Sequence, residues 1–155
     1  MNVVRNLVQS LGIRNLRSAI DLNRAGLIQN KDIDSINSIA QALPISITPH
    51  LAELIEENTS SDPISRQFVP DLAEATISPE ELKDPIGDNT HSPVPGIVHR
   101  YPDRVLLTPV KSCPVYCRYC FRRDVVGSGL LDQAALEAAL DYIGKHREIW
   151  EVILS

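Results

Sequence analysis

The sequence lacks the features that mark secreted and membrane proteins. It has only three cysteines, and no apolar run approaches the roughly 20 residues needed to cross a bilayer. The first residues also lack the basic segment and the apolar stretch of a signal peptide. These absences exclude a disulfide-stapled domain and a membrane-spanning chain. We therefore expect a cytoplasmic protein with no membrane partner.

Aromatic residues are also scarce, since the 155 residues include two Phe, one Trp and four Tyr. A core must therefore rest on Leu, Ile, Val and Ala. Hydrophobic residues make up 43% of the chain and charged residues 23%. This balance is typical of folded globular proteins and excludes a disordered or collagen-like chain.

Basic residues are a minority in the chain, but they are concentrated in one stretch. The net charge is −5, which argues against a nucleic-acid partner. Between Arg100 and Arg123, six basic side chains face one acidic side chain, and this stretch also contains the cysteines. The pattern favours a pocket for small anions, although Arg118 and Arg123 fit a solvated surface equally well.

Residues 1–58 are predicted to form a helical region. Pro44 ends one predicted helix, whose apolar positions recur at helical spacing at Ile33, Ile36, Ile39 and Ala40. A second helix is predicted to begin at Thr48 and Pro49, because Thr caps helices and Pro fits the first helical position.

Residues 59–98 are rich in Pro, Ser, Asp and Thr, and we interpret them as an extended connector without a core of its own. Within this connector, Ser78–Glu81 has the pattern of a capping box and predicts one short helix.

Residues 99–155 are predicted to form a βαβ unit with parallel strands and a right-handed connection. The strands are Arg104–Val110 and Trp150–Leu154, and the helix begins after Asp132. The predicted apolar face of this helix contains Leu136, Ala139, Leu140 and Ile143. Because two strands and one helix leave a parallel sheet uncovered, we expect a truncated chain. The alternative is a complete α-rich domain that ends on a two-stranded sheet.

The three cysteines follow the first predicted strand with the spacing C-x3-C-x2-C, at Cys113, Cys117 and Cys120. Three thiolates on one loop can hold three irons of a 4Fe–4S cluster and leave the fourth iron open to a non-protein ligand. Two alternatives stay open: a zinc-binding interaction module with His99 or His91 as the fourth ligand, and three unligated thiols.

This loop, with aromatic Tyr119 before its last cysteine, resembles the radical S-adenosylmethionine (SAM) enzymes. Two longer stretches, His91–Leu106 and Val115–Arg123, are similar to the lysine 2,3-aminomutase family. The resemblance extends from about residue 84 to residue 155. It implies a helical amino-terminal region followed by the first βαβ unit of a truncated radical SAM (β/α) barrel, with the active site on loops at the strand carboxyl ends.

The resemblance implies an isomerase that converts L-lysine, free or destined for elongation factor P, to β-lysine. Its cofactors would be the 4Fe–4S cluster, SAM and pyridoxal 5′-phosphate (PLP). Its partners would be an electron donor such as flavodoxin or ferredoxin and a second copy of the chain in a homo-oligomer. The alternative substrate is another amino acid, such as glutamate. We expect this fragment to be inactive alone.

The resemblance also gives individual residues a role. The three cysteines correspond to the cluster ligands, and Tyr119 to the residue packed beside the cluster and adenine. Arg100 and Arg104 correspond to arginines that face PLP, and Arg122 to the arginine that pairs with the substrate carboxylate. A planar guanidinium suits both anions, because it donates two parallel hydrogen bonds to a carboxylate or a phosphate. The lysine that anchors PLP in the family is absent from this sequence.

Overall fold

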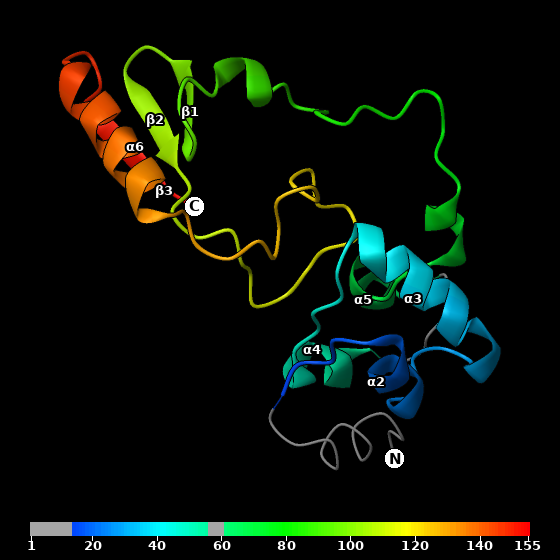
Figure 1. Cartoon of the computed structure of the whole chain (residues 1–155). Helices are drawn as coiled ribbons and strands as arrows, with labels where there is room; N and C mark the ends of the chain where they lie inside the picture. Colours follow the sequence, from blue (N-terminus) through cyan, green and yellow to red (C-terminus); the bar gives the residue numbers. More distant parts are fainter. Residues whose placement is uncertain (1–13, 56–60) are drawn as a thin grey trace. The chain divides into compact units, whose positions relative to one another are not determined.

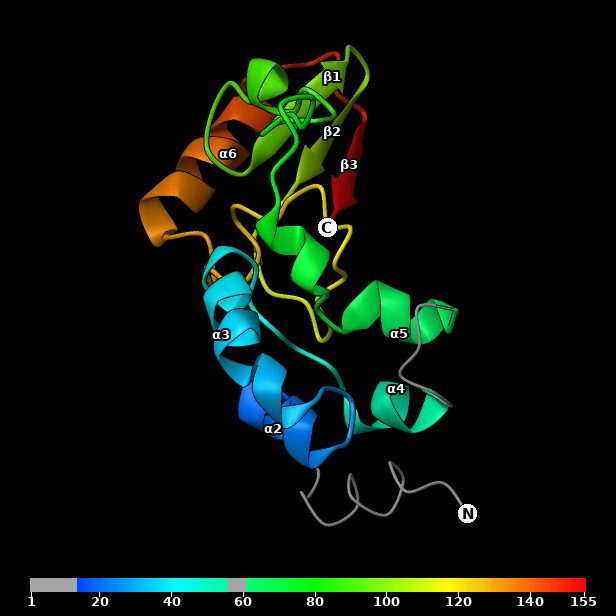
Figure 2. The same ribbon diagram turned by 90° about the vertical axis from the view of Figure 1, so that its right-hand side faces the viewer.

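The computed structural model describes residues 14–55 and 61–155 (Figures 1 and 2). The predicted helical region at 1–13 and 56–58 lies outside these described residues. Among the described residues, no helix has the length and apolar character needed to cross a bilayer.

The chain is divided between two units, each built from two separate stretches. Unit 1 contains the described residues up to Pro79 together with Cys113–Val126. Unit 2 contains Glu80–Ser112 and Gly127–Ser155. The cysteines therefore belong to the mainly helical unit 1. The predicted division at residues 58 and 98 stays a prediction.

Unit 1 consists of short helices and the loop that contains the cysteines. In chain order, its helical elements are α2 (Ala19–Arg24), η1 (Asn30–Asp32), α3 (Ile33–Ala42), α4 (Pro49–Leu54), α5 (Pro63–Phe68) and η2 (Leu72–Ala75). Figures 1 and 2 show α2 lying beside α3. Fully or almost fully buried side chains from several of these segments form its core, including Leu16, Leu22, Leu27, Ile36, Ile47, Ala52 and Ile55.

The predicted helices at α3 and α4 are confirmed. Ile36 and Ile39 face the core of unit 1, as their spacing indicates. The Thr48 hydroxyl accepts a hydrogen bond from the Leu51 N–H at 3.3 Å, and Pro49 is the first residue of α4. Local capping signals therefore determine where α4 begins.

The segment predicted as a connector contains a helix that was not predicted from its sequence. Helix α5 lies inside it, and Phe68 and Val69 pack into the core of unit 1. The helix predicted at Ser78–Glu81 is wrong, because the chain makes only a turn there. Pro85 disfavours helix at the residue before it, and the few residues that remain cannot nucleate one. The capping box occurs instead at η2, between Asp71 and Glu74.

Unit 2 contains a three-stranded sheet in the order β1-β2-β3 and one long helix (Figure 2). Its elements are η3 (Asn89–His91), β1 (Ile97–Tyr101), β2 (Arg104–Leu107), α6 (Gln133–Lys145) and β3 (Glu151–Leu154). Strands β1 and β2 are antiparallel, whereas β2 and β3 are parallel, with Val105 opposite Val152. The predicted parallel βαβ unit is confirmed in β2, α6 and β3. Its right-handed connection and its place in a (β/α) barrel stay predictions.

Helix α6 packs on the sheet through Ala139, which is fully buried against Ile97, Val105 and Leu107. The prediction that Asp132 caps this helix is confirmed, because its carboxylate accepts a hydrogen bond from the Ala135 N–H at 2.8 Å. The predicted apolar face is wrong at one position. Leu140 is 53% exposed, whereas the predicted Ile143 packs beside the core together with Tyr142, which was not predicted there.

Candidate functional site

The two ends of the cysteine stretch are joined by backbone hydrogen bonds within unit 2. The Lys111 N–H donates to the Gly129 carbonyl at 2.7 Å, and the Gly127 N–H donates to the Lys111 carbonyl at 2.6 Å. Gly127 and Gly129 have φ values of 87° and 91°, which only glycine adopts without strain. We call the stretch between these residues the cysteine loop (residues 112–126). Its two ends are therefore held together by hydrogen bonds.

The first part of the cysteine loop is attached to two segments of unit 1 that lie next to its helices. The Pro114 carbonyl accepts hydrogen bonds from Ser46 Oγ at 3.0 Å and from Asn15 Nδ2 at 2.7 Å. The Tyr116 N–H donates to the Ser46 carbonyl at 2.9 Å. Ser46 is 1% exposed, so the segment after the first cysteine is held by a buried residue.

Arg118 attaches the middle of the loop. Its N–H donates to the Gln67 carbonyl at 2.8 Å, and its side chain is only 3% exposed. The guanidinium donates to both carboxylate oxygens of Glu74, with Nη2 to Oε2 at 2.6 Å. It also donates to the carbonyls of Leu43 at 3.1 Å and Pro44 at 3.3 Å. From the sequence, Arg118 fitted a surface position and an anion pocket equally well. In the structure it is buried and forms an ion pair with Glu74.

The three cysteines are free thiols with different exposure. Cys113 is exposed, whereas Cys117 and Cys120 are partly buried. Cys117 packs against the core of unit 1, and the Cys120 N–H donates to the Cys117 carbonyl at 3.1 Å. Among residues 14–55 and 61–155, no three Cys, His, Asp or Glu side chains are gathered in a group that holds a metal ion. The loop thus has the right donor atoms for an iron–sulfur cluster, but the thiols do not converge on one point.

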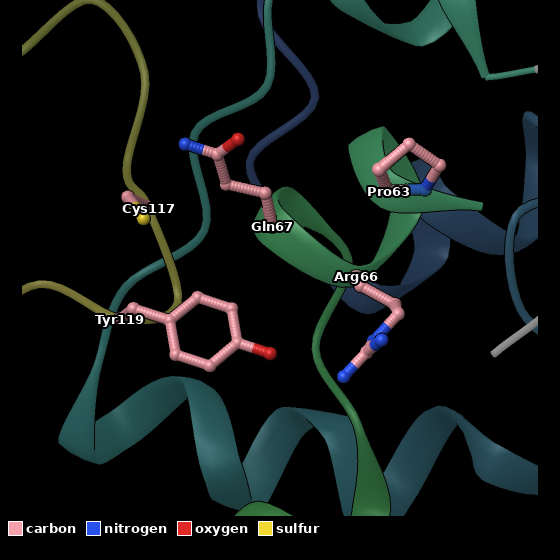
Figure 3. A pocket seen from close by; sticks show the side chains of 5 residues that line it. All are labelled: Pro63, Arg66, Gln67, Cys117 and Tyr119. Carbon is pink, nitrogen blue, oxygen red and sulfur yellow. The ribbon is translucent and has the colours of Figure 1, made fainter. Parts of the chain in front are cut away.

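A pocket of about 340 Å³ lies beside Cys117 (Figure 3). Pro63, Arg66 and Gln67 of α5 form one wall, and Cys117 and Tyr119 form the other. Figure 3 shows the hydroxyl of Tyr119 directed towards the side of the pocket that holds Arg66. A guanidinium, an aromatic ring and a thiol therefore border one open pocket, which suits a small anionic ligand with a flat ring.

Arg66 and Gln67 were not predicted as site residues, because they lie in the segment interpreted as a connector. A signal for α5 was present, since Asp62 before Pro63 repeats the pattern of a capping residue followed by proline. In the structure, Asp62 accepts a hydrogen bond from the Ile64 N–H at 3.0 Å. The same capping rule that located α4 would have located this wall of the pocket.

Arg122, expected to bind the substrate carboxylate, lies near the end of the cysteine loop. Its guanidinium lies 5.1 Å from the centre of the Phe121 ring, in a cation–π contact. The side chain is partly buried. The structure therefore places Arg122 in unit 1, on the same loop as the cysteines.

Arg100 and Arg104, expected to face PLP, lie in unit 2 and have protein partners. Arg100 pairs with Asp88 at 3.2 Å. Arg104 pairs with Asp103 at 2.7 Å and with Glu151 at 3.2 Å. Arg104 is the first residue of β2, whereas the cysteine loop follows the other end of that strand. A phosphate group would have to share these guanidinium groups with the carboxylates or displace them.

The ion pair between Arg104 and Asp103 shifts the pKa of both side chains. Hydrogen bonds from Arg104 lower the pKa of Asp103 to about 2, and the Trp150 indole also donates to this carboxylate at 3.3 Å. In return, the hydrogen bond to Asp103 raises the pKa of Arg104. The Arg104 guanidinium also lies 5.8 Å from the centre of the Trp150 ring. These contacts join the hairpin between β1 and β2 to the start of β3.

The two histidines considered as zinc ligands belong to unit 2. The Nδ1 atom of His99 is 2.7 Å from the Tyr142 hydroxyl, and its ring packs edge-on against Tyr142 and His146. His91 ends the short helix η3. His99 is therefore already engaged in an aromatic cluster with α6.

Comparison with known proteins identifies the relatives of this chain. No family model matches the sequence. It is 33% identical over 154 residues to an L-lysine 2,3-aminomutase of Clostridium subterminale, covering 98% of this chain and 35% of that protein. It is 38% identical over 128 residues to an L-lysine 2,3-aminomutase of Methanococcus maripaludis, covering 81% of this chain and 30% of the relative.

A glutamate 2,3-aminomutase of Clostridioides difficile is 29% identical over 136 residues, covering 86% of this chain and 32% of the relative. The chain thus spans about a third of the length of the curated relatives that it matches. Because the similarity to several aminomutases covers most of this sequence, cysteine loop included, the chain belongs to the lysine 2,3-aminomutase family.

Proposed function

We propose that this chain is part of a radical SAM aminomutase, in which Cys113, Cys117 and Cys120 bind a 4Fe–4S cluster. The observation that carries the proposal is the similarity to lysine 2,3-aminomutases over 98% of the chain. The three free thiols on one loop support it, because thiolates are the ligands of such clusters. Binding has to draw the thiols together, since they are not gathered in the described residues.

When bound, the cluster, SAM and PLP supply the radical chemistry that moves an amino group between neighbouring carbons of an amino acid. The chain's own residues bind and orient these groups. Tyr119 borders the pocket beside Cys117 and forms a flat surface for adenine. Arg122 would bind the substrate carboxylate, and Arg100 and Arg104 would bind the phosphate of PLP in place of their carboxylate partners.

We propose L-lysine as the substrate, free or on elongation factor P, because most of the relatives described above are lysine aminomutases. The glutamate aminomutase makes glutamate the second candidate. The proposed reaction needs a one-electron donor, such as flavodoxin or ferredoxin, in the cytoplasm. We expect no turnover from this chain alone, because it spans only about a third of the length of its relatives.

Anaerobic reconstitution with iron and sulfide tests the proposal. The chain should become brown and bind about four irons. Cys117→Ala should lose most of this iron, whereas the control Ser112→Ala, beside the first cysteine, should bind as the wild type does. A colourless chain that holds stoichiometric zinc after the same treatment would support the zinc-binding module and contradict the proposal.

A further inference from the structure

Arg118 is the least exposed residue of the cysteine loop, although it stands between two cysteines of the motif. It is 5% exposed, whereas Cys113 is exposed and Cys117 and Cys120 are partly buried. Long basic side chains are rarely buried unless they are paired. The burial of Arg118 therefore requires an explanation beyond the basic character of the loop.

Every nitrogen of the Arg118 guanidinium has an acceptor. Nε and Nη2 donate to the carboxylate of Glu74, 44 positions earlier in the chain. Nη1 donates to the carbonyls of Leu43 and Pro44. A lysine could not make this set of bonds, because its three donors project from one atom and not from a planar fork.

The Glu74 carboxylate is also held by a hydrogen bond from its own helix end. Its Oε1 accepts a hydrogen bond from the Asp71 N–H at 3.0 Å, as part of the capping box of η2. Leu43 is the C-cap residue of α3, so its carbonyl is one that the helix itself leaves without a partner. Arg118 therefore joins the loop to η2 and to the end of α3 through groups that are already fixed.

The hydrogen bonds of Arg118 contribute more to the conformation of the loop than to the stability of the fold. Replacing a buried ion pair by apolar residues is often neutral for stability, because removing two charges from water is costly. What an apolar residue cannot supply is the fixed geometry of these hydrogen bonds. Together with the Gln67 carbonyl, which accepts from the Arg118 N–H, they fix the backbone directly after Cys117.

We propose that Arg118 and Glu74 act as a positioning pair, which holds the backbone between Cys117 and Cys120 in place while the thiols are drawn together around the iron–sulfur cluster. This inference rests on the proposed function of the cysteines. The pair does not touch the cluster in this proposal; it acts through the backbone of the loop. Cluster retention then depends on a glutamate in η2, outside the cysteine motif.

Four variants of the full chain test this pair: Arg118→Lys, Glu74→Gln, the apolar double variant Arg118→Met with Glu74→Leu, and the control Arg123→Met. Arg123 is an exposed arginine of the same loop. After anaerobic reconstitution, iron and sulfide content, the electron paramagnetic resonance spectrum of the reduced cluster and its release rate to a chelator are measured. Far-UV circular dichroism and thermal unfolding report the fold.

We expect the wild type and Arg123→Met to retain the cluster equally. Arg118→Lys, Glu74→Gln and the double variant should release it at least about tenfold faster, with an altered spectrum, because each loses hydrogen bonds to a charged group. In the absence of iron, iodoacetamide should alkylate Cys117 faster in the same three variants. The double variant should keep the thermal stability of the wild type, which a purely structural role would not allow.

The inference is overturned if folded variants of the pair retain the cluster with wild-type spectrum and release rate, an outcome that leaves the proposed function intact. It is also overturned if both Glu74→Gln and the double variant lose their helical signal, because the pair would then be holding the fold. If the wild type binds no cluster under conditions in which it is folded, the proposed function fails and the inference fails with it.

Discussion

The hydroxyl of Ser46 donates a 3.0 Å hydrogen bond to the carbonyl of Pro114, 68 positions further along the chain. Ser46 lies between α3 and α4, whereas Pro114 directly follows the first cysteine of the motif. The backbone of the cysteine loop is therefore attached to a buried point of unit 1 within one residue of its first thiol.

Ser46→Ala should lower the free energy of unfolding by about 1 kcal/mol, the usual net contribution of a hydrogen bond. The loss is limited because the Pro114 carbonyl keeps its bond from Asn15. Urea unfolding followed by circular dichroism measures the change. Ser38→Ala, at an exposed position of α3, is the matched control and should not destabilise the chain. Equal midpoints for the two variants would contradict this prediction.

Unit 1 should lose stability in acid through Asp21. Burial alone would raise the pKa of this carboxyl, but hydrogen bonds from the Arg17 N–H and the Ser18 hydroxyl, with the charge of Arg14, lower it below 3.8. Because the folded pKa is the lower one, the stabilisation is present above about pH 4 and is lost as the pH falls below it.

Unfolding measured between pH 6 and about pH 2.5 should therefore show a steeper loss of stability in the wild type than in Asp21→Asn. Asp34→Asn, at an exposed position of α3, should follow the wild-type curve. Parallel curves for the wild type and Asp21→Asn would remove Asp21 as the cause.

Two glycines of unit 2 should respond to alanine in opposite directions. Gly96 has a φ of 85°, and a Cβ atom there would lie 2.5 Å from Leu131 Cδ2, so Gly96→Ala should cost at least about 1–2 kcal/mol. Gly144 lies in α6 with nothing within 4 Å of its Cβ position, so Gly144→Ala should stabilise by about 0.5–1 kcal/mol. Thermal unfolding gives both signs, and a neutral Gly96→Ala would argue against this backbone conformation.

In unit 2, truncation of a buried side chain of the sheet should destabilise the fold, whereas truncation on the exposed face of α6 should not. Ile97 is 1% exposed, and Ile97→Ala should cost about 2–5 kcal/mol through lost burial and the cavity left behind. Leu140 is 53% exposed, and Leu140→Ala should change stability by less than about 0.5 kcal/mol. Chemical denaturation of both variants measures the loss of stability. A larger loss for Leu140→Ala than for Ile97→Ala would contradict this packing of α6.

The elements that the sequence predicted correctly are those with local signals. Thr48 and Asp132 each precede a helix and cap it with their own side chains. Strands β2 and β3 are short apolar runs on either side of α6, so their parallel pairing follows from the connection between them. Such signals act within a few residues and can be read without knowing the rest of the fold.

Strand β1 lacks a signal of this kind. Ile97 is its only buried residue, and it also contains His99 and Arg100, which are polar. Its strand conformation comes from pairing with β2, in which Ile97 lies opposite Leu107. Strand preference depends strongly on such neighbours, so the sequence of β1 alone did not reveal it.

The candidate site divides in the same way. The cysteines and the residues around them indicated the family, and their spacing predicts a loop that binds an iron–sulfur cluster. The partners of Arg118 lie 44 and 75 positions away, and no pattern within the loop points to Glu74 or Leu43. The role of the thiols therefore stays a prediction from the sequence, whereas the elements that hold their loop could be found only in the folded chain.

The alternation of the chain between the two units affects the order in which it can fold during synthesis. Unit 1 needs Cys113–Val126, which the ribosome makes only after it has made all of Glu80–Ser112. Glu74 therefore has no ion-pair partner in Arg118 until the first stretch of unit 2 has been made. Contacts between such distant segments slow folding, because closing the long loop of chain between them costs conformational entropy. A single proteolytic cut between these stretches therefore cannot release either unit whole.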